Sequence, residues 1–351
     1  MIKRKLRIAY FSLYDNDFYE DFSINSKKYG GGTVFAKWAK ELWNNDEKEF
    51  YIFTPKIAWE HIDETKENKF CFIDLPRDFC KALKSGINIK RLISNINYFD
   101  IILHGHTNVA LNNENCRSIQ VHWAGFGRAS DGHPFIPYTF IYGPDLTPYY
   151  NEQKTFPIIL GKPVPKEFIE NKKEDFIFQC SRHNDGLSSI EIAKECIRYK
   201  IKGIFAGTIG KDYKLMDYIN NINTFFLGEI SDNEKKELNK KARLTTYVQN
   251  FGEVFNQSVI ESLAEGTPVL RKDIKKTNDP TFRNWLKDII IDNYNGVVYN
   301  GNNFLDCWER SKSINQKNCW ETAKKFSVEE MMKTFEDGIN FVIKDSNVIL
   351  E

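Results

Sequence analysis

The sequence has no cysteine pairs in a redox or zinc-binding spacing, no apolar run of membrane-spanning length and almost no net charge. Its seven cysteines are scattered through 351 residues without a Cys-x-x-Cys pair. This odd, unpaired set argues against a disulfide framework and is typical of a reduced compartment. The formal net charge of +1 gives no strong electrostatic attraction to nucleic acid or to an anionic membrane.

Nothing in the sequence predicts a membrane span, because no apolar stretch approaches the roughly 20 residues that a transmembrane helix needs. The basic start, 1–7, leads into a strand-like run and not into the apolar segment of a signal peptide. We therefore expect a cytoplasmic protein. Peripheral contact with a membrane and the oligomeric state stay open.

Strand-like and helix-like segments alternate along the whole chain, whose length predicts two domains. The expected helices include 33–43, 188–199 and 233–241. The expected strands are 6–11, 50–53, 99–103, 119–121, 140–142 and 156–160, then 175–179, 203–206, 224–227, 244–248, 268–270 and 289–293. A Pro- and Gly-punctuated linker, 161–166, separates the two series. This rhythm predicts an α/β protein with two Rossmann-like, doubly wound domains and a ligand in the cleft at the carboxyl ends of the sheets.

The most informative stretch runs from 251 to 270. Glu253 and Glu261 stand eight positions apart, and the short polar turn Asn256-Gln257-Ser258 lies between them. The pattern predicts a strand end, a loop, a helix that Gly stops, and a further strand. The amino end of a helix suits a diphosphate, because its free N–H groups and its dipole favour an anion. Carboxylates on either side would accept hydrogen bonds from hydroxyls, which is the layout of a nucleoside diphosphate sugar.

This stretch resembles the E-x7-E element of the family 4 retaining glycosyltransferases, which have the GT-B fold. The positions that match in register are Glu253, Phe255, Glu261, Gly266, Pro268 and Val269. The family's Gly-Leu-Pro is replaced by 256–258, which would act through backbone N–H groups. A lone E-x7-E pattern occurs often by chance, so the weight rests on the accompanying matches.

Several other positions fit the same family. Gly31 and Gly32 resemble its Gly-Gly loop, where the backbone approaches the ligand closely. The run 100–106 resembles its Asp-Val-Val-His-x-His strand end, and His122 resembles the histidine beside the donor sugar. A metal site is the alternative for these histidines, and the family's chemistry needs no metal ligand from the protein. In the second half, 227–231 and 292–298 also match family motifs.

One departure concerns the diphosphate. Arg182 stands where the family has the arginine that grips the diphosphate. The lysine that follows in the family has no counterpart, because Asp185 stands near its place, and Lys211 is one candidate substitute. The diphosphate contacts and the level of activity therefore stay open at this point.

The chain ends in an amphipathic helix that begins at a capping-box pattern, Ser327 to Glu330. One face of this helix is apolar: Val328, Met331, Met332, Phe335, Ile339 and Val342. In the family this helix crosses back to the first domain, whereas the pattern alone fits packing on either domain. By resemblance the first domain is 1–165 with helix 327–351, and the second, which binds the nucleotide sugar, is 166–326.

The resemblance implies a retaining glycosyltransferase that moves a sugar from a nucleoside diphosphate sugar to a glycan, a lipid-linked glycan or another hydroxyl acceptor. Glu261 would hold the ribose, Glu253 the transferred sugar, and His122 would orient that sugar. The N–H groups of 256–258 and Arg182 would stabilise the diphosphate, with no cofactor and no required divalent metal. The alternatives are a transferase acting on a modified DNA base, a nucleotide-sugar 2-epimerase, and a catalytically silent subunit that binds sugar nucleotides.

Overall fold

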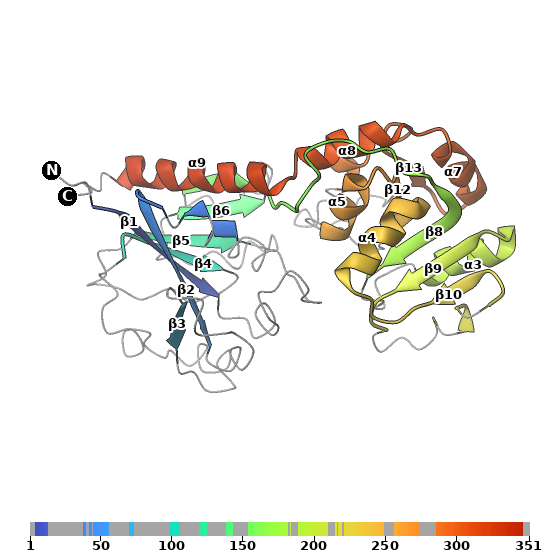
Figure 1. Cartoon of the computed structure of the whole chain (residues 1–351), viewed down its shortest axis with the longest axis horizontal. Coiled ribbons are helices and arrows are strands. Elements are labelled where there is room, and N and C mark those ends of the chain that lie inside the picture. Colours follow the sequence, from blue (N-terminus) through green and yellow to red (C-terminus); the bar gives the residue numbers. More distant parts are fainter. Residues whose placement is uncertain are drawn as a thin grey trace. The chain divides into compact units, whose positions relative to one another are not determined.

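The computed structural model describes residues 4–12, 38–39, 42–43, 45–55, 70–73, 99–105, 119–124, 138–142, 154–181, 183, 189–209, 215, 217–219, 221–248, 256–273 and 286–346 (Figure 1). The chain divides into two compact units. The first unit contains 1–160 and 329–351, and the second contains 161–328. Each unit is built around its own parallel sheet.

The first unit contains a seven-stranded sheet in the order β3-β2-β1-β4-β5-β6-β7. The strands are β1 (Leu6–Ser12), β2 (Lys48–Pro55), β3 (Phe70–Ile73), β4 (Ile101–Gly105), β5 (Ile119–Ala124), β6 (Tyr138–Tyr142) and β7 (Lys154–Ile158). Every neighbouring pair is parallel. The central strands are apolar, and consecutive residues are buried along each of them: Ile8, Ala9 and Tyr10 in β1, and Ile101, Ile102 and Leu103 in β4. Such continuous burial is expected of a parallel sheet covered on both faces.

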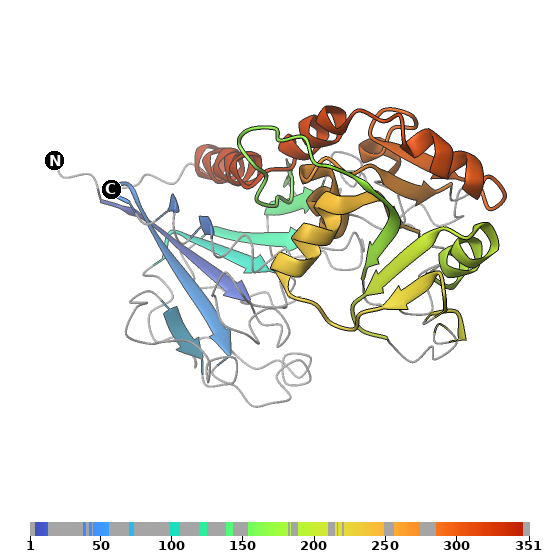
Figure 2. The ribbon, with the colours of Figure 1, turned by 45° about the vertical axis from the view of Figure 1, so that its right-hand side comes forward.

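The C-terminal helix α9 (Val328–Ser346) packs on this first sheet (Figures 1 and 2). The ring of Phe335 meets that of Phe140 edge-on at 5.8 Å, and the Tyr138 hydroxyl donates to Asp345 at 2.6 Å. Gly338 makes the close approach possible, because a Cβ there would lie 2.7 Å from the Phe140 ring. All six members of the predicted apolar face are buried, which confirms that part of the sequence prediction.

The second unit contains a six-stranded sheet in the order β10-β9-β8-β11-β12-β13. Its strands are β8 (Glu174–Cys180), β9 (Lys202–Ala206), β10 (Thr224–Phe226), β11 (Ala242–Tyr247), β12 (Val269–Lys272) and β13 (Gly296–Tyr299), and all pair in parallel. The helices are α3 (Ser189–Tyr199), α4 (Asp232–Lys241), α5 (Gln257–Ala264), α6 (Leu286–Ile289), α7 (Phe304–Ser311) and α8 (Gln316–Lys324). The predicted α/β class with parallel sheets is confirmed.

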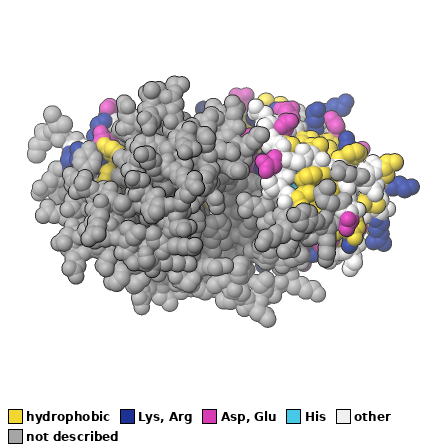
Figure 3. Space-filling model, turned by 90° about the horizontal axis from the view of Figure 1, so that it is seen from below, with side chains coloured by type: hydrophobic (Ala, Val, Ile, Leu, Met, Phe, Trp, Pro, Cys, Tyr) yellow, Lys and Arg dark blue, Asp and Glu magenta, His cyan; other side chains and the backbone are white. Residues whose placement is uncertain are grey.

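Alternation along β8 shows how this sheet is covered. Phe176 and Phe178 pack with Leu238 of α4, whereas Ile177 lies in the larger apolar cluster with Ile192 of α3. Successive side chains of a strand point to opposite faces, so the two helices cover opposite sides. On the described surface in Figure 3, side chains of both charge signs are interspersed with apolar ones, in keeping with the near-neutral composition.

One predicted strand, 289–293, is wrong. Ile289 ends helix α6, and the strand begins at Gly296. The reason is the buried side chain of Asn295. Its Oδ1 accepts from the Ile291 N–H and its Nδ2 donates to the Ile289 carbonyl, both at 2.8 Å. These bonds close a turn directly after the helix. Ile289 and Ile290 are buried by helix and turn packing, whereas Ile291 is exposed, so the apolar run does not continue as a strand.

Candidate functional site

The second sheet changes direction between β8 and β11. From β8 the chain moves outward through β9 and β10, then returns to β11 on the other side and continues to β12 and β13. In open α/β sheets, ligands bind at such a switch point, outside the carboxyl ends of the two strands. Cys180 is the last residue of β8 and Tyr247 is the last of β11.

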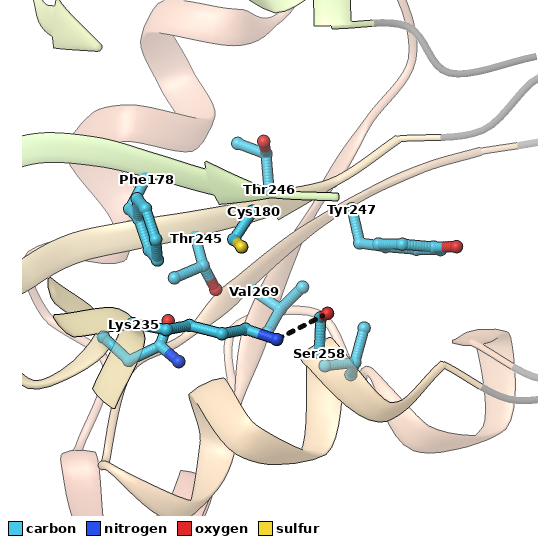
Figure 4. A pocket seen from close by; sticks show the side chains of 10 residues that line it. Phe178, Cys180, Lys235, Thr245, Thr246, Tyr247, Ser258 and Val269 are labelled. Carbon is cyan, nitrogen blue, oxygen red and sulfur yellow. Dashed lines mark hydrogen bonds between the residues drawn. The ribbon is translucent and has the colours of Figure 1, made fainter. Parts of the chain in front are cut away.

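A pocket lies at this switch point, between the sheet and helices α4 and α5 (Figure 4). It contains about 270 Å³ of space, part of which is open to solvent. Its lining residues are Phe178, Cys180, Lys235, Asn239, Thr245, Thr246, Tyr247, Ser258, Val259 and Val269. Burial raises the pKa of the Cys180 thiol, so this sulfur is a neutral thiol at physiological pH.

Helix α5 starts beside this pocket. Asn256 caps the helix, and its side chain accepts from the Val259 N–H at 3.2 Å. That bond leaves the N–H groups of Gln257 and Ser258 without acceptors inside the helix. Both residues are partly exposed. The first turn therefore presents two oriented donors and the positive end of the helix dipole.

Glu261 lies one turn further along α5, between two lysines. Lys162 Nζ is 2.7 Å from Glu261 Oε1, and Lys235 Nζ contacts Oε2. Burial alone would raise the pKa of Glu261, but the two ammonium groups outweigh burial and lower this pKa to about 2. Glu261 is therefore an ionised carboxylate that can only accept hydrogen bonds, and 22% of its side chain stays exposed. The two oxygens have about four acceptor positions and the two ammonium groups do not fill them, although the Oε2 atom itself is buried.

The two lysines come from different parts of the fold. Lys162 follows directly on the boundary between the units, and its backbone bonds to Phe326 and Val328, where the chain leaves the second unit. Lys235 belongs to α4 and donates to Ser258 Oγ at 3.2 Å. Asp232, in the first turn of α4, is also close. Burial, reinforced by the charge of Glu261, raises the pKa of Asp232.

The structure brings four of the predicted site residues together on one helix, namely Asn256, Gln257, Ser258 and Glu261. His122 lies in β5, where its backbone is paired in register with His104 of β4. The two histidines thus lie side by side in neighbouring strands, and β5 continues past His122 to Ala124. Their side chains are outside the described part. Gly31, Gly32, Arg182 and Glu253 also lie outside the described residues, as does Asp185.

Sequence reasoning did not identify Lys162 or Lys235. Lys162 lies in the predicted linker, and Lys235 lies in α4, a helix that is almost entirely polar. The sequence therefore predicts that both side chains are exposed to solvent. One signal was present in α4. Leu238 is the only apolar residue of this helix, and Lys235 precedes it by three positions, so both lie on the same helix face.

Within the described part of the chain, no three His, Cys, Asp or Glu side chains gather closely enough to hold a metal ion. A search of the same residues for a helix long and apolar enough to cross a membrane found none.

Neither a family model nor a curated protein matches the sequence. Solved structures of glycosyltransferases do match the fold over nearly the whole chain. Sucrose-phosphate synthase from Thermosynechococcus elongatus superposes with a TM-score of 0.70 at 12% identity, covering 98% of this chain and 100% of its own. The lipopolysaccharide outer core galactosyltransferase WaaB gives 0.66 at 14% identity, with 95% and 99% covered. HepE from Anabaena, in complex with UDP and glucose, gives 0.65 at 13% identity, with 95% and 99% covered. The chain therefore has the GT-B fold of glycosyltransferases.

Proposed function

We propose that this protein is a retaining glycosyltransferase of the family 4 type, which transfers a sugar from a nucleoside diphosphate sugar to a hydroxyl acceptor. The observation that carries the proposal is the ionised Glu261, held one turn above the amino end of α5 at the switch point of a GT-B sheet. At that position the carboxylate of Glu261 can accept hydrogen bonds from two ribose hydroxyls. The N–H groups of the first turn of α5, next to it, can donate to the diphosphate. A nucleoside diphosphate needs both kinds of contact.

The donor would be held in two places. The ribose hydroxyls would donate to the carboxylate of Glu261, and the N–H groups of Gln257 and Ser258 would donate to the diphosphate, together with Arg182. The matching HepE structures contain UDP or UDP-glucose, so uridine diphosphate sugars are the first donors to test. The default acceptor is a glycan or lipid-linked glycan.

Catalysis would be electrostatic. As the bond between the sugar carbon and the phosphate oxygen breaks, negative charge accumulates on the departing diphosphate, and the helix donors and Arg182 stabilise it. The acceptor hydroxyl would attack on the face that the diphosphate leaves, passing its proton to a phosphate oxygen, which retains the anomeric configuration. Glu253 would bind the hydroxyls of the transferred sugar and His122 would orient it. No protein-bound metal is required.

The test is calorimetric titration with a panel of nucleoside diphosphates and their sugars, followed by assays of donor hydrolysis and transfer. Glu261→Ala should weaken binding of the nucleoside diphosphate itself. Glu253→Ala should leave that affinity unchanged but abolish transfer. If Glu261→Ala binds the nucleotide as the parent does, the ribose assignment is wrong. Tight donor binding without hydrolysis or transfer to any acceptor class would instead identify a silent binding subunit.

A further inference from the structure

We infer that Lys235 binds a phosphate oxygen of the donor and supplies the positive charge that the sequence lacks where Asp185 replaces a lysine. The inference rests on the proposed function and assigns a ligand contact to a helix, α4, that no motif of the sequence marks.

The position of the Lys235 ammonium is the first support. Its Nζ lies 3.2 Å from Ser258 Oγ, in the first turn of α5, and it lines the pocket at the switch point (Figure 4). In that view the long side chain of Lys235 extends from α4 toward Ser258. The ammonium therefore lies beside the helix end that is expected to receive the diphosphate.

A count of donors is the second support. An ammonium group has three N–H bonds. Within the described residues, Glu261 Oε2 and Ser258 Oγ are the acceptors that Lys235 Nζ contacts. One N–H bond remains for a third acceptor, and the pocket is the polar space next to it. A phosphate oxygen fits this requirement, since it accepts strong charge-assisted hydrogen bonds.

The surroundings keep Lys235 charged. Burial disfavours the ammonium, but the carboxylate of Glu261 outweighs burial and raises the pKa of Lys235, with a smaller contribution from the carboxylate of Asp232. Lys235 also lies between the carboxylate proposed to hold the ribose and the helix turn proposed to hold the diphosphate. A cation at this place would reach the phosphate on the ribose side.

Lys162 provides a matched control. It also forms an ion pair with Glu261, through the other carboxylate oxygen, and it is similarly buried. Unlike Lys235, it does not line the pocket. Removing Lys162 should therefore disturb Glu261 without removing a phosphate contact.

The experiment compares the parent with Lys235→Gln and Lys162→Gln. Affinities for uridine, UMP and UDP are measured by calorimetry, with the weak ligands measured by competition, and the guanosine and adenosine series serve as alternatives. The readout is the ratio of the nucleoside Kd to the diphosphate Kd. Lys235→Gln should lower this ratio roughly ten- to a hundredfold, the loss expected for one charge-assisted hydrogen bond. Lys162→Gln should change both affinities by a similar factor and keep the ratio within about twofold of the parent value, because its effect runs through Glu261.

An unchanged ratio in Lys235→Gln, or an equal fall in both variants, would overturn the assignment of Lys235 while leaving the proposed function standing. If the parent protein binds none of the diphosphates, both the assignment of Lys235 and the proposed function are wrong. If Lys235→Gln does not fold, Lys235→Met keeps the length and the apolar stem of the side chain, and the same ratio decides the question.

Discussion

The ammonium of Lys162 lies 2.7 Å from the carboxylate of Glu261, and this contact joins the start of the second unit to the middle of helix α5. The backbone of Lys162 is itself bonded to Phe326 and Val328, where the chain leaves the same unit. The proposed ribose-binding carboxylate is thus positioned by the two chain segments at the boundary of the unit. Substitutions there should affect donor binding even where they touch no ligand.

Acid should destabilise the second unit through Glu261. Its pKa in the folded protein is about 2, against an ordinary value of 4.5. Because the folded-state value is depressed, the stabilisation is complete above pH 4.5 and is lost as the pH falls toward 2. The shift corresponds to at most about 3 kcal/mol. Urea unfolding of the parent between pH 6 and 2.5 should show this loss, and Glu261→Gln should lack it. A parallel decline in both proteins would contradict the assignment.

Lys173 should act as a half-buried structural cation. Its Nζ donates to the Lys240 carbonyl at 2.8 Å, to the Glu265 carbonyl at 3.2 Å, and to the hydroxyl of Thr267. Lys173→Met removes all three bonds and should lower the free energy of unfolding by about 2–3 kcal/mol. The exposed neighbour Lys172 is the control, and Lys172→Met should stay within about 0.5 kcal/mol of the parent in urea titrations.

Lys173 should also make the stability of the protein depend on pH in the alkaline range. Burial lowers the pKa of Lys173 from 10.5 to about 8. Between these values the folded protein has lost a proton that the unfolded chain still holds, so this group should make the protein more stable as the pH rises from 8 to 10.5. The difference in stability between the parent and Lys173→Met, measured across that range, isolates this contribution. If the stability difference between the parent and Lys173→Met becomes smaller as the pH rises, the folded protein favours the charged form of Lys173, and the prediction is wrong.

Gly296 should tolerate no side chain. A Cβ at this position would lie 2.2 Å from the Val269 carbonyl oxygen and 2.5 Å from the Ile290 side chain. The carbonyl belongs to the backbone of the neighbouring strand and cannot move aside. Gly296→Ala should therefore cost more than about 3 kcal/mol or prevent folding. Gly301→Ala is the comparison, because Gly301 has a φ of +98° but open space around it, and it should cost only about 1–2 kcal/mol. Soluble yield and urea midpoints measure both.

His183 should make the protein sensitive to mild acid. Its Nε2 donates to the Ala206 carbonyl at 2.9 Å, which leaves Nδ1 to accept from the Ser189 hydroxyl at 2.8 Å, so the ring is held in its neutral form. Burial lowers the pKa of His183 below 6.5. The unfolded chain therefore takes up a proton first, and stability should fall as the pH drops below 6.5. His183→Gln should be less stable at pH 7.5 but should lose stability less steeply between pH 7 and 5. Equal slopes would exclude this role.

Local sequence patterns were sufficient to predict much of this protein. The alternation of strand and helix, the start of α5 near Asn256 and its stop at Gly266, which has a φ of +70°, follow from rules that act within a few residues. The apolar face of α9 follows from a 3.6-residue period in the same way. These features depend on neighbours along the chain, so one sequence is enough to predict them.

The details of the site were decided by residues that lie far apart in the chain. Lys162 and Lys235 contact Glu261 only because the sheet places β8 beside β11 and packs α4 next to α5. The run 289–293 has strand-like composition, yet it ends a helix because Asn295 and Gly296 close a turn against β12. Burial, ion pairing and steric clash act through space, and no local period encodes them, so only the folded chain shows which lysines meet the carboxylate.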